Sequence, residues 1–268
     1  MRRIGRVLAC ASQAFASALV LYALFIMRPI LTSHAADNAR PGTAGQGGRR
    51  SGTAAETAPA HAGVPGGRLL LLAHPALQNA ASWHFYSRAL RGAGHTLYFF
   101  EYSCREASLD RAGQRLAAVL DGIARETSGR KVILLGASLG GLICRAALPH
   151  VRRQDCMAGL ITLACPHKGS RLASLVPQAL FPLLASITYN GPAIQDLEAR
   201  EAERPAIHAS RAAFFSNGDE LVLPHDALHP PQQDGWREMP SGSFSHMAIM
   251  LHPRVIRAVI REIGAIPV

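Results

Sequence analysis

Residues 131–148 read KVILLGASLGGLICRAAL and contain the pattern that decides the fold. The apolar run before Gly136 predicts a short buried strand, and the segment from Gly141 onward predicts a helix. Ser138 stands at the apex of the turn between them, where glycines let the backbone bend sharply and leave room beside the side chain. A G-x-S-x-G match between a strand and a helix is typical of a nucleophile elbow. The alternative is a plain glycine-rich turn.

Strand-like and helix-like segments alternate along the rest of the chain from Arg68. The pattern predicts strands at 69–73, 96–102, 158–164 and 212–216, and helices at 82–92, 109–127 and 247–263. This alternation predicts a mostly parallel sheet covered by helices on both faces. Ligands of such sheets bind at the carboxyl ends of the strands, which is the edge where Ser138 lies.

A serine hydroxyl needs an imidazole to take its proton, and that imidazole needs an acid to orient it. In folds with this type of elbow the chain order is nucleophile, acid, base. Asp219 lies at the tip of a polar turn after the apolar segment 212–216, so we expect it to be the acid. Glu220 and Asp226 are competitors, and Asp219 could also serve only as a turn cap.

For the base, the sequence favours His246, which comes just before the last predicted helix. His225 and His229 are alternatives that lie beside the acid turn. His252 is a third alternative and falls inside the predicted helix, directly before Pro253.

A developing oxyanion needs two backbone N–H donors. Leu139, directly after Ser138, is expected to supply one. The second should come from the loop after the first strand, where Pro75 has no N–H, so Ala76 is favoured with Leu77 as fallback. His74 could orient this loop through a hydrogen bond, or it could be a partly buried histidine at a strand end.

With these residues in view, the chain resembles bacterial lipases and esterases of the α/β-hydrolase superfamily over about residues 68–266. The resemblance rests on LGASLGG at 135–141, on CPHKGS at 165–170, on Gly218-Asp219 with Val222 and Pro224, and on Ser245-His246. CPHKGS is similar to the T-P-H-x-G-S turn of lipases, with Cys165 in place of threonine. The resemblance implies an α/β-hydrolase fold and ester chemistry without metal or cofactor. Pro75 departs from the family's usual His-Gly.

The superfamily inserts lids after this second motif, and here that position is occupied by residues 171–205. The resemblance therefore implies a short lid, which would suit acyl-chain substrates. An ordinary core helix with a loop is the alternative interpretation. The apolar residues of the segment are Leu172, Leu175, Val176, Leu180, Phe181, Leu183, Leu184 and Ile187.

The N-terminus predicts a membrane attachment. Three arginines at positions 2, 3 and 6 precede Val7 to Met27, a segment without charge that is long enough to span a bilayer. Cleavage of a signal peptide after Ala35 is the alternative. Both place the rest of the chain outside the cytoplasm, either anchored, or secreted or periplasmic. We expect residues 1–35 to be the anchor or signal peptide, 36–66 a flexible linker, and 67–268 the hydrolase domain.

The formal net charge of +10 suggests a nucleic-acid partner, but the arginines are scattered and are not interleaved with aromatic residues. We therefore expect no nucleic-acid partner, and a mild attraction to anionic membrane surfaces stays open. The five cysteines include no C-x-x-C pair or zinc spacing, which argues against a metal site. Cys144 and Cys165 are expected to be buried, and a disulfide involving Cys104 or Cys156 stays open.

The expected function is hydrolysis of carboxylic esters, lipid or acyl esters above all, through Ser138, Asp219 and His246. A thioesterase, phospholipase or acyltransferase would use the same residues, and the sequence does not separate these. A binding protein of the same fold without catalysis is the remaining alternative, because the oxyanion loop is altered at Pro75.

Overall fold

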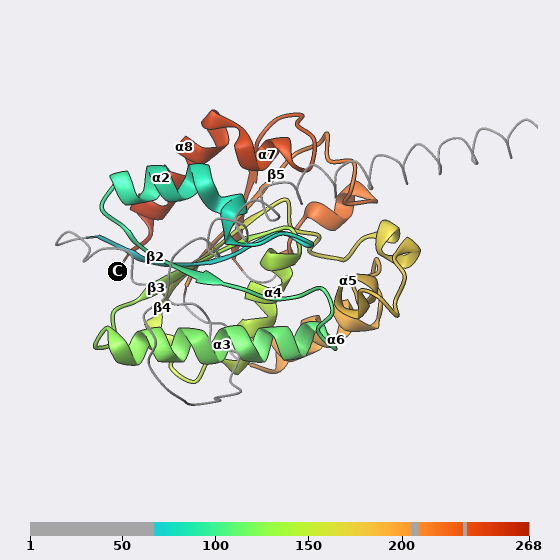
Figure 1. The fold of residues 1–268 in the computed structure, drawn as a ribbon, viewed down its shortest axis with the longest axis horizontal. Coiled ribbons are helices and arrows are strands. Elements are labelled where there is room, and N and C mark those ends of the chain that lie inside the picture. The colour runs from blue at the N-terminus through green and yellow to red at the C-terminus, as the bar shows by residue number, and fades with distance from the viewer. Residues whose placement is uncertain (1–66, 205–208, 233–234, 268) are drawn as a thin grey trace, which may run out of the picture. The chain divides into compact units, whose positions relative to one another are not determined.

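The computed structural model describes residues 67–204, 209–232 and 235–267 of the 268-residue chain. The described strands form one parallel sheet of six strands in the order β2-β1-β3-β4-β5-β6 (Figure 1). Their bounds are β1 Leu69–Ala73, β2 Thr96–Phe100, β3 Val132–Ala137, β4 Met157–Leu163, β5 Ser210–Phe215 and β6 Trp236–Pro240. The expected parallel sheet is confirmed.

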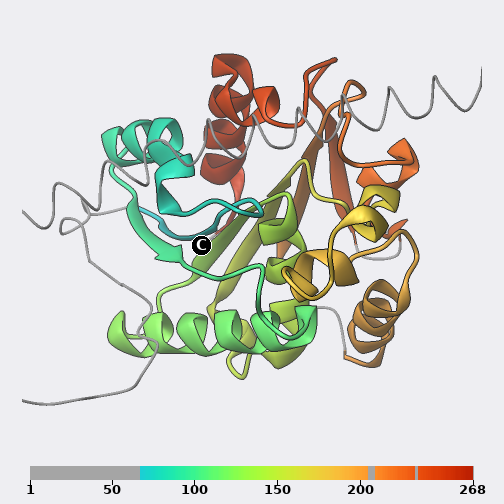
Figure 2. The same ribbon diagram turned by 45° about the vertical axis from the view of Figure 1, so that its right-hand side comes forward.

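Helices cover both faces of this sheet, as expected (Figures 1 and 2). One face carries α3 Leu109–Glu126, α4 Leu139–Ala147, α5 Pro182–Ser186 and α6 Pro192–Glu203. The other face carries α2 His84–Gly92, α7 Ala248–Leu251 and α8 Pro253–Ala265. Short 3₁₀ turns join them: η1 Ala80–Trp83, η2 Leu148–His150, η3 Gln154–Cys156, η4 Arg171–Leu175 and η5 His225–Leu228.

The central strands are apolar along their whole length because helices bury both of their faces. Every residue of β1, β3 and β4 is buried. Alternate side chains of β1 enter different cores: Leu69 and Leu71 pack toward α3 and α4, whereas Leu70 and Leu72 pack toward α2 and α8. This double core fixes the carboxyl ends of the strands at one edge, where β3 leads into α4.

The prediction of a single helix over 247–263 is wrong, because α7 ends at Leu251 and α8 begins at Pro253. His252 between them has φ −75° and ψ 122°, an extended conformation. Proline disfavours the helical conformation in the residue before it, so Pro253 breaks the helix there. The His252 side chain then caps α8 by accepting a hydrogen bond from the Arg254 N–H.

Two further elements differ from expectation. Strand β6 was not predicted, because its sequence WREMP is polar and half-exposed at the sheet edge. In the segment 171–205, Leu183, Ile187, Ile194 and Leu197 are buried in the core below α3 and α4. Leu175 and Leu180 are 68% and 54% exposed. The part of this segment from Leu183 onward therefore contributes side chains to the core, and the exposed Leu175 and Leu180 come before it.

The predicted anchor or signal peptide at 1–35 and the predicted linker at 36–66 lie outside the described residues. Within the described ranges, every helix is too short or too polar to cross a bilayer.

Candidate active site

Ser138 lies in a strained turn between β3 and α4. Its φ of 51° and ψ of −123° fall in a region that residues with a side chain rarely adopt. The Ser138 N–H donates to the Leu163 carbonyl at 2.8 Å, which ties the turn to the end of β4. Strain of this kind persists only where the surrounding structure enforces it, and it is concentrated at functional sites.

The glycines on either side of Ser138 are required by close backbone contacts. A Cβ atom on Gly136 would lie 2.6 Å from the Gly140 carbonyl oxygen. A Cβ atom on Gly140 would lie 2.3 Å from the carbonyl oxygen of Ala73, at the end of β1. The glycines of the pattern thus allow α4 to start directly against the neighbouring strand.

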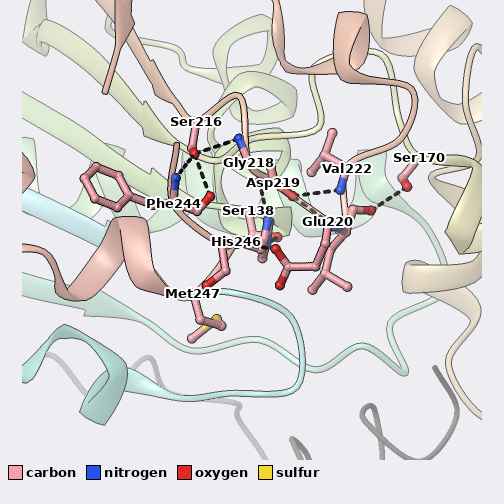
Figure 3. A network of polar contacts seen from close by, with 12 residues as sticks. Ser138, Ser170, Ser216, Gly218, Asp219, Glu220, Val222, Phe244, His246 and Met247 are labelled. Carbon is pink, nitrogen blue, oxygen red and sulfur yellow. Dashed lines mark hydrogen bonds and ion pairs between the residues drawn. The ribbon is translucent and has the colours of Figure 1, made fainter. Parts of the chain in front are cut away.

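Ser138, His246 and Asp219 form a continuous chain of hydrogen bonds (Figure 3). His246 Nε2 lies 2.9 Å from Ser138 Oγ, and His246 Nδ1 lies 2.7 Å from Asp219 Oδ2. The other carboxylate oxygen, Asp219 Oδ1, accepts from the N–H groups of Leu221 and Val222 at 3.0 and 2.9 Å. Asp219 and His246 are 1% and 5% exposed, so the buried carboxylate has a donor on each oxygen.

Two residues hold the loop of Asp219 and the loop of His246 together. Ser216 Oγ contacts the Gly242 and Phe244 carbonyls and accepts from the N–H groups of Gly218 and Phe244, so one buried hydroxyl joins both loops (Figure 3). Glu220 Oε2 accepts from the His246 backbone N–H at 2.9 Å. These contacts fix the distance between the acid and the histidine.

The residues that competed for the roles of acid and base make other contacts. Glu220 contacts the backbone of His246, and Asp226 accepts from Tyr189 and pairs with Lys168. His225 Nε2 contacts the backbone carbonyl of Asp219 at 2.8 Å. His229 pairs with Glu238, and His252 caps α8.

The two predicted oxyanion donors have N–H groups that are not engaged elsewhere. Leu139 is the first residue of α4, so its N–H has no acceptor within the helix. The Ala76 N–H has no acceptor among the described residues. The N–H group of the fallback donor, Leu77, is already engaged, because it donates a hydrogen bond to Cys104 Sγ at 3.3 Å. The backbone of Leu77 has a φ of 59°.

His74 is fully buried rather than partly buried, and it holds the loop that carries Ala76. Its Nδ1 lies 2.8 Å from the Pro75 carbonyl, its Nε2 lies 3.3 Å from Glu101 Oε2, and its ring stacks on Tyr102. Burial raises the pKa of the Glu101 carboxyl, but the bonds from His74 and from the Ala80 N–H outweigh this and leave that pKa below its usual range. The loop is thus fixed by side chains at the end of β2.

The CPHKGS turn contacts helix α4 and the loop of Asp219, and a buried arginine of α4 joins it to helix α6. Arg145 of α4 is fully buried, pairs with both carboxylate oxygens of Glu201 in α6, and donates to the His167 carbonyl at 2.7 Å. Burial lowers the pKa of His167 well below its usual range, and the charge of Arg145 acts in the same direction. Ser170 donates to the Leu221 carbonyl at 2.8 Å, which links this turn to the acid loop.

The described cysteines are free. Cys144 and Cys165 are buried as expected, and burial raises the pKa of both thiols. Cys104 and Cys156 form no disulfide with a described cysteine. Cys104 instead accepts from the loop that follows β1.

The sequence did not single out Ser216, and it considered Cys104 only for a disulfide and Glu220 only as a rival acid. Their contacts join loops that are 26 to 28 residues apart in the chain, so local patterns carry little signal for them. Ser170 belongs to the CPHKGS motif, but its bond to Leu221 depends on how the acid loop folds back.

The family follows from a comparison with protein-family models. Residues 70–265 match the model described as the alpha/beta hydrolase family. The chain belongs to this family. The match covers every described strand except the first residue of β1, and it includes Ser138, Asp219 and His246. No curated protein matches the chain.

Solved lipase structures share the fold of this alpha/beta hydrolase. The mature lipase BlEst2 of Bacillus licheniformis is 17% identical with a TM-score of 0.59, over 77% of this chain and 96% of that one. Lipase B of Aspergillus fumigatus is 16% identical with a TM-score of 0.62, over 74% of this chain and 52% of that one. A monoacylglycerol lipase of Paleococcus ferrophilus is 18% identical with a TM-score of 0.53, over 73% and 95%. At these identities the likeness establishes the alpha/beta hydrolase fold.

Proposed function

We propose that this alpha/beta hydrolase is a serine hydrolase that cleaves carboxylic esters, with Ser138 as nucleophile, His246 as base and Asp219 as the acid that orients it. One observation carries the proposal: His246 lies within hydrogen-bond distance of Ser138 Oγ on one ring nitrogen and of Asp219 on the other. An imidazole held in this way can take a proton from the serine while the carboxylate stabilises the imidazolium that forms.

In the proposed reaction Ser138 Oγ attacks the ester carbonyl carbon as its proton moves to His246 Nε2. The N–H groups of Leu139 and Ala76 hold the oxyanion of the tetrahedral intermediate. The intermediate collapses to an acyl-enzyme, and His246 gives the proton to the departing alcohol. Water then attacks the acyl-enzyme with His246 again as base, which releases the acid and restores Ser138.

An acyl or lipid ester is the substrate class that the surroundings of the site support. The large hydrophobic side chains that are exposed in the described chain all lie in segments that follow the carboxyl ends of strands, the edge that carries Ser138. They are Leu77, Phe85, Leu175, Leu180 and Leu251. Exposed apolar side chains near a site favour apolar partners. The lipases with the same fold act on substrates of this kind, which is consistent with the proposal.

Labelling with a fluorophosphonate probe tests the nucleophile, and p-nitrophenyl esters of graded chain length test the substrate class. We expect the full chain to be labelled and Ser138→Ala to lose the label together with about a thousandfold or more of kcat. Ser174→Ala, a change at an exposed serine outside the triad, is the matched control. A folded wild-type protein that takes no label would refute catalysis and leave a binding protein of the same fold.

We also propose that the N-terminal segment attaches the hydrolase domain to a membrane and places it outside the cytoplasm, or that cleavage after Ala35 releases it. This proposal rests on the sequence of residues 1–35 alone. The mass of the mature protein distinguishes the two forms, since cleavage removes 35 residues. A domain that stays accessible only to cytoplasmic protease would contradict both.

A further inference from the structure

Helices α2 and α8 lie side by side on one face of the sheet (Figures 1 and 2). Both helices expose basic side chains. In α8, Arg254, Arg257 and Arg261 follow each other at helical spacing and are all exposed. In α2, Arg88 and Arg91 are exposed in the same way, together with His84 and Phe85. We call this surface the α2–α8 face.

The α2–α8 face lacks compensating negative charge. Helix α2 contains no acidic residue, and the one acidic residue of α8, Glu262, is buried and paired with Arg237. Among the described residues, Arg88, Arg254, Arg257 and Arg261 have no carboxylate partner. Arg91 lies over the ring of Phe99.

The helices on the opposite face of the sheet differ in this respect. There Arg115 pairs with Glu106, Arg145 with Glu201, and Arg200 with Asp110 and Asp196. Carboxylates therefore pair with several arginines of the α3–α6 face, although Arg111 and Arg125 of α3 pair with none of the described carboxylates. Helices α2 and α8, in contrast, expose no carboxylate at all.

Two exposed apolar side chains border this basic surface. Phe85 is 54% exposed and precedes Arg88 by one helical turn; Leu251, at the end of α7, is 49% exposed and precedes Arg254 by three residues. Helix α2 follows the carboxyl end of β1, and α7 follows His246 directly, so both side chains lie on the side of the sheet edge that carries the triad.

We propose that the α2–α8 face docks on a bilayer that contains anionic phospholipid. The arginine guanidinium groups would bind headgroup phosphates, and Phe85 and Leu251 would enter the boundary between headgroups and acyl chains. A nucleic acid would use the arginines as well, but it gives no role to an exposed leucine. Docking of this kind brings the edge that holds Ser138 close to the lipid surface, and it does not depend on what Ser138 catalyses.

Tryptophan quenching by brominated phosphatidylcholine tests contact at a defined position when it is measured as the difference from the parent chain, which carries only the native Trp83 and Trp236. The full chain carries Ser138→Ala in every sample, so lipid is not hydrolysed and the N-terminal segment is common to all variants. Phe85→Trp reports on the α2–α8 face, and Gln114→Trp, at an exposed position of α3, is the matched control. Vesicles of phosphatidylcholine alone are compared with vesicles that also contain phosphatidylglycerol.

We expect quenching of Trp at position 85 on the anionic vesicles, a decrease at raised salt, and little quenching at position 114. Replacing Arg254, Arg257 and Arg261 by glutamine should raise the lipid concentration needed for half-maximal quenching by at least about tenfold. Lysine at the three positions should leave this concentration unchanged. Glutamine at Arg111, Arg125 and Arg152 removes the same charge from exposed positions elsewhere and should have little effect.

The proposal would be overturned if tryptophans at positions 85 and 114 were quenched equally. It would also be overturned if the two triple glutamine variants lost the same amount of quenching, because net charge alone would then explain binding. Fluorescence at position 85 that responds to a short DNA duplex but not to anionic vesicles would overturn it in favour of a nucleic-acid surface.

Discussion

The backbone N–H of His246 donates a hydrogen bond to Glu220 Oε2 at 2.9 Å, while the His246 side chain bonds to the neighbouring residue Asp219. Two successive acidic residues therefore hold one histidine, the first by its ring and the second by its backbone. The Glu220 side chain is exposed, so its charge is partly screened by water, yet its contact sets the position of the histidine loop.

We predict that Glu220→Ala lowers kcat/KM by about three- to tenfold, because a hydrogen bond to a charged acceptor is lost. Glu220→Gln keeps an oxygen acceptor and should recover most of this loss. Glu126→Ala, at an exposed carboxylate on α3, is the control. A wild-type kcat/KM in Glu220→Ala would exclude a positioning role for Glu220.

Cys104 gives a second prediction, since its Sγ accepts from the Leu77 N–H next to the predicted oxyanion donor Ala76. Cys104→Ala should lower kcat about fivefold with little change in KM, as expected from the loss of one hydrogen bond that holds the loop. Cys104→Ser keeps an acceptor and should be close to wild type. The control is Cys156→Ala, at a buried free cysteine next to the start of β4. Equal rates for the alanine and wild-type enzymes would contradict a role in the loop.

The sequence was sufficient to predict those parts of the candidate site that depend on local patterns and on chain order. The glycines around Ser138, the turn at Asp219 and the position of His246 before the last helices all follow from such patterns, and the structure brings these three side chains together. Contacts of Ser216, Glu220 and Cys104 depend on how distant loops dock, so they could not be predicted from spacing. Strand β6 was missed because pairing at the sheet edge, rather than an apolar run, makes WREMP a strand.

Arg145 and Glu201 lead to a prediction about stability. The guanidinium is fully buried and the carboxylate of Glu201 is 9% exposed, so removing one partner leaves a charge inside the protein without compensation. Glu201→Gln should lower the free energy of unfolding by about 3 kcal/mol in urea titrations. Glu198→Gln changes an exposed carboxylate on the same helix and should cost less than about 0.5 kcal/mol. Similar midpoints for the two variants would contradict the importance of the buried pair.

His167 predicts how stability depends on pH. Burial, together with the charge of Arg145, lowers its pKa well below the ordinary value of 6.5, so the native protein keeps the ring neutral while the unfolded chain binds a proton below about pH 6.5. The unfolded state then holds more protons, and this residue lowers the free energy of unfolding by up to about 1.4 kcal/mol per pH unit as the pH falls below that value. His167→Gln should remove this component from the slope between pH 7 and pH 5 in urea titrations, whatever its effect on stability at pH 7. The exposed control His84→Gln should keep the wild-type slope, and a wild-type slope in His167→Gln would disprove the assignment.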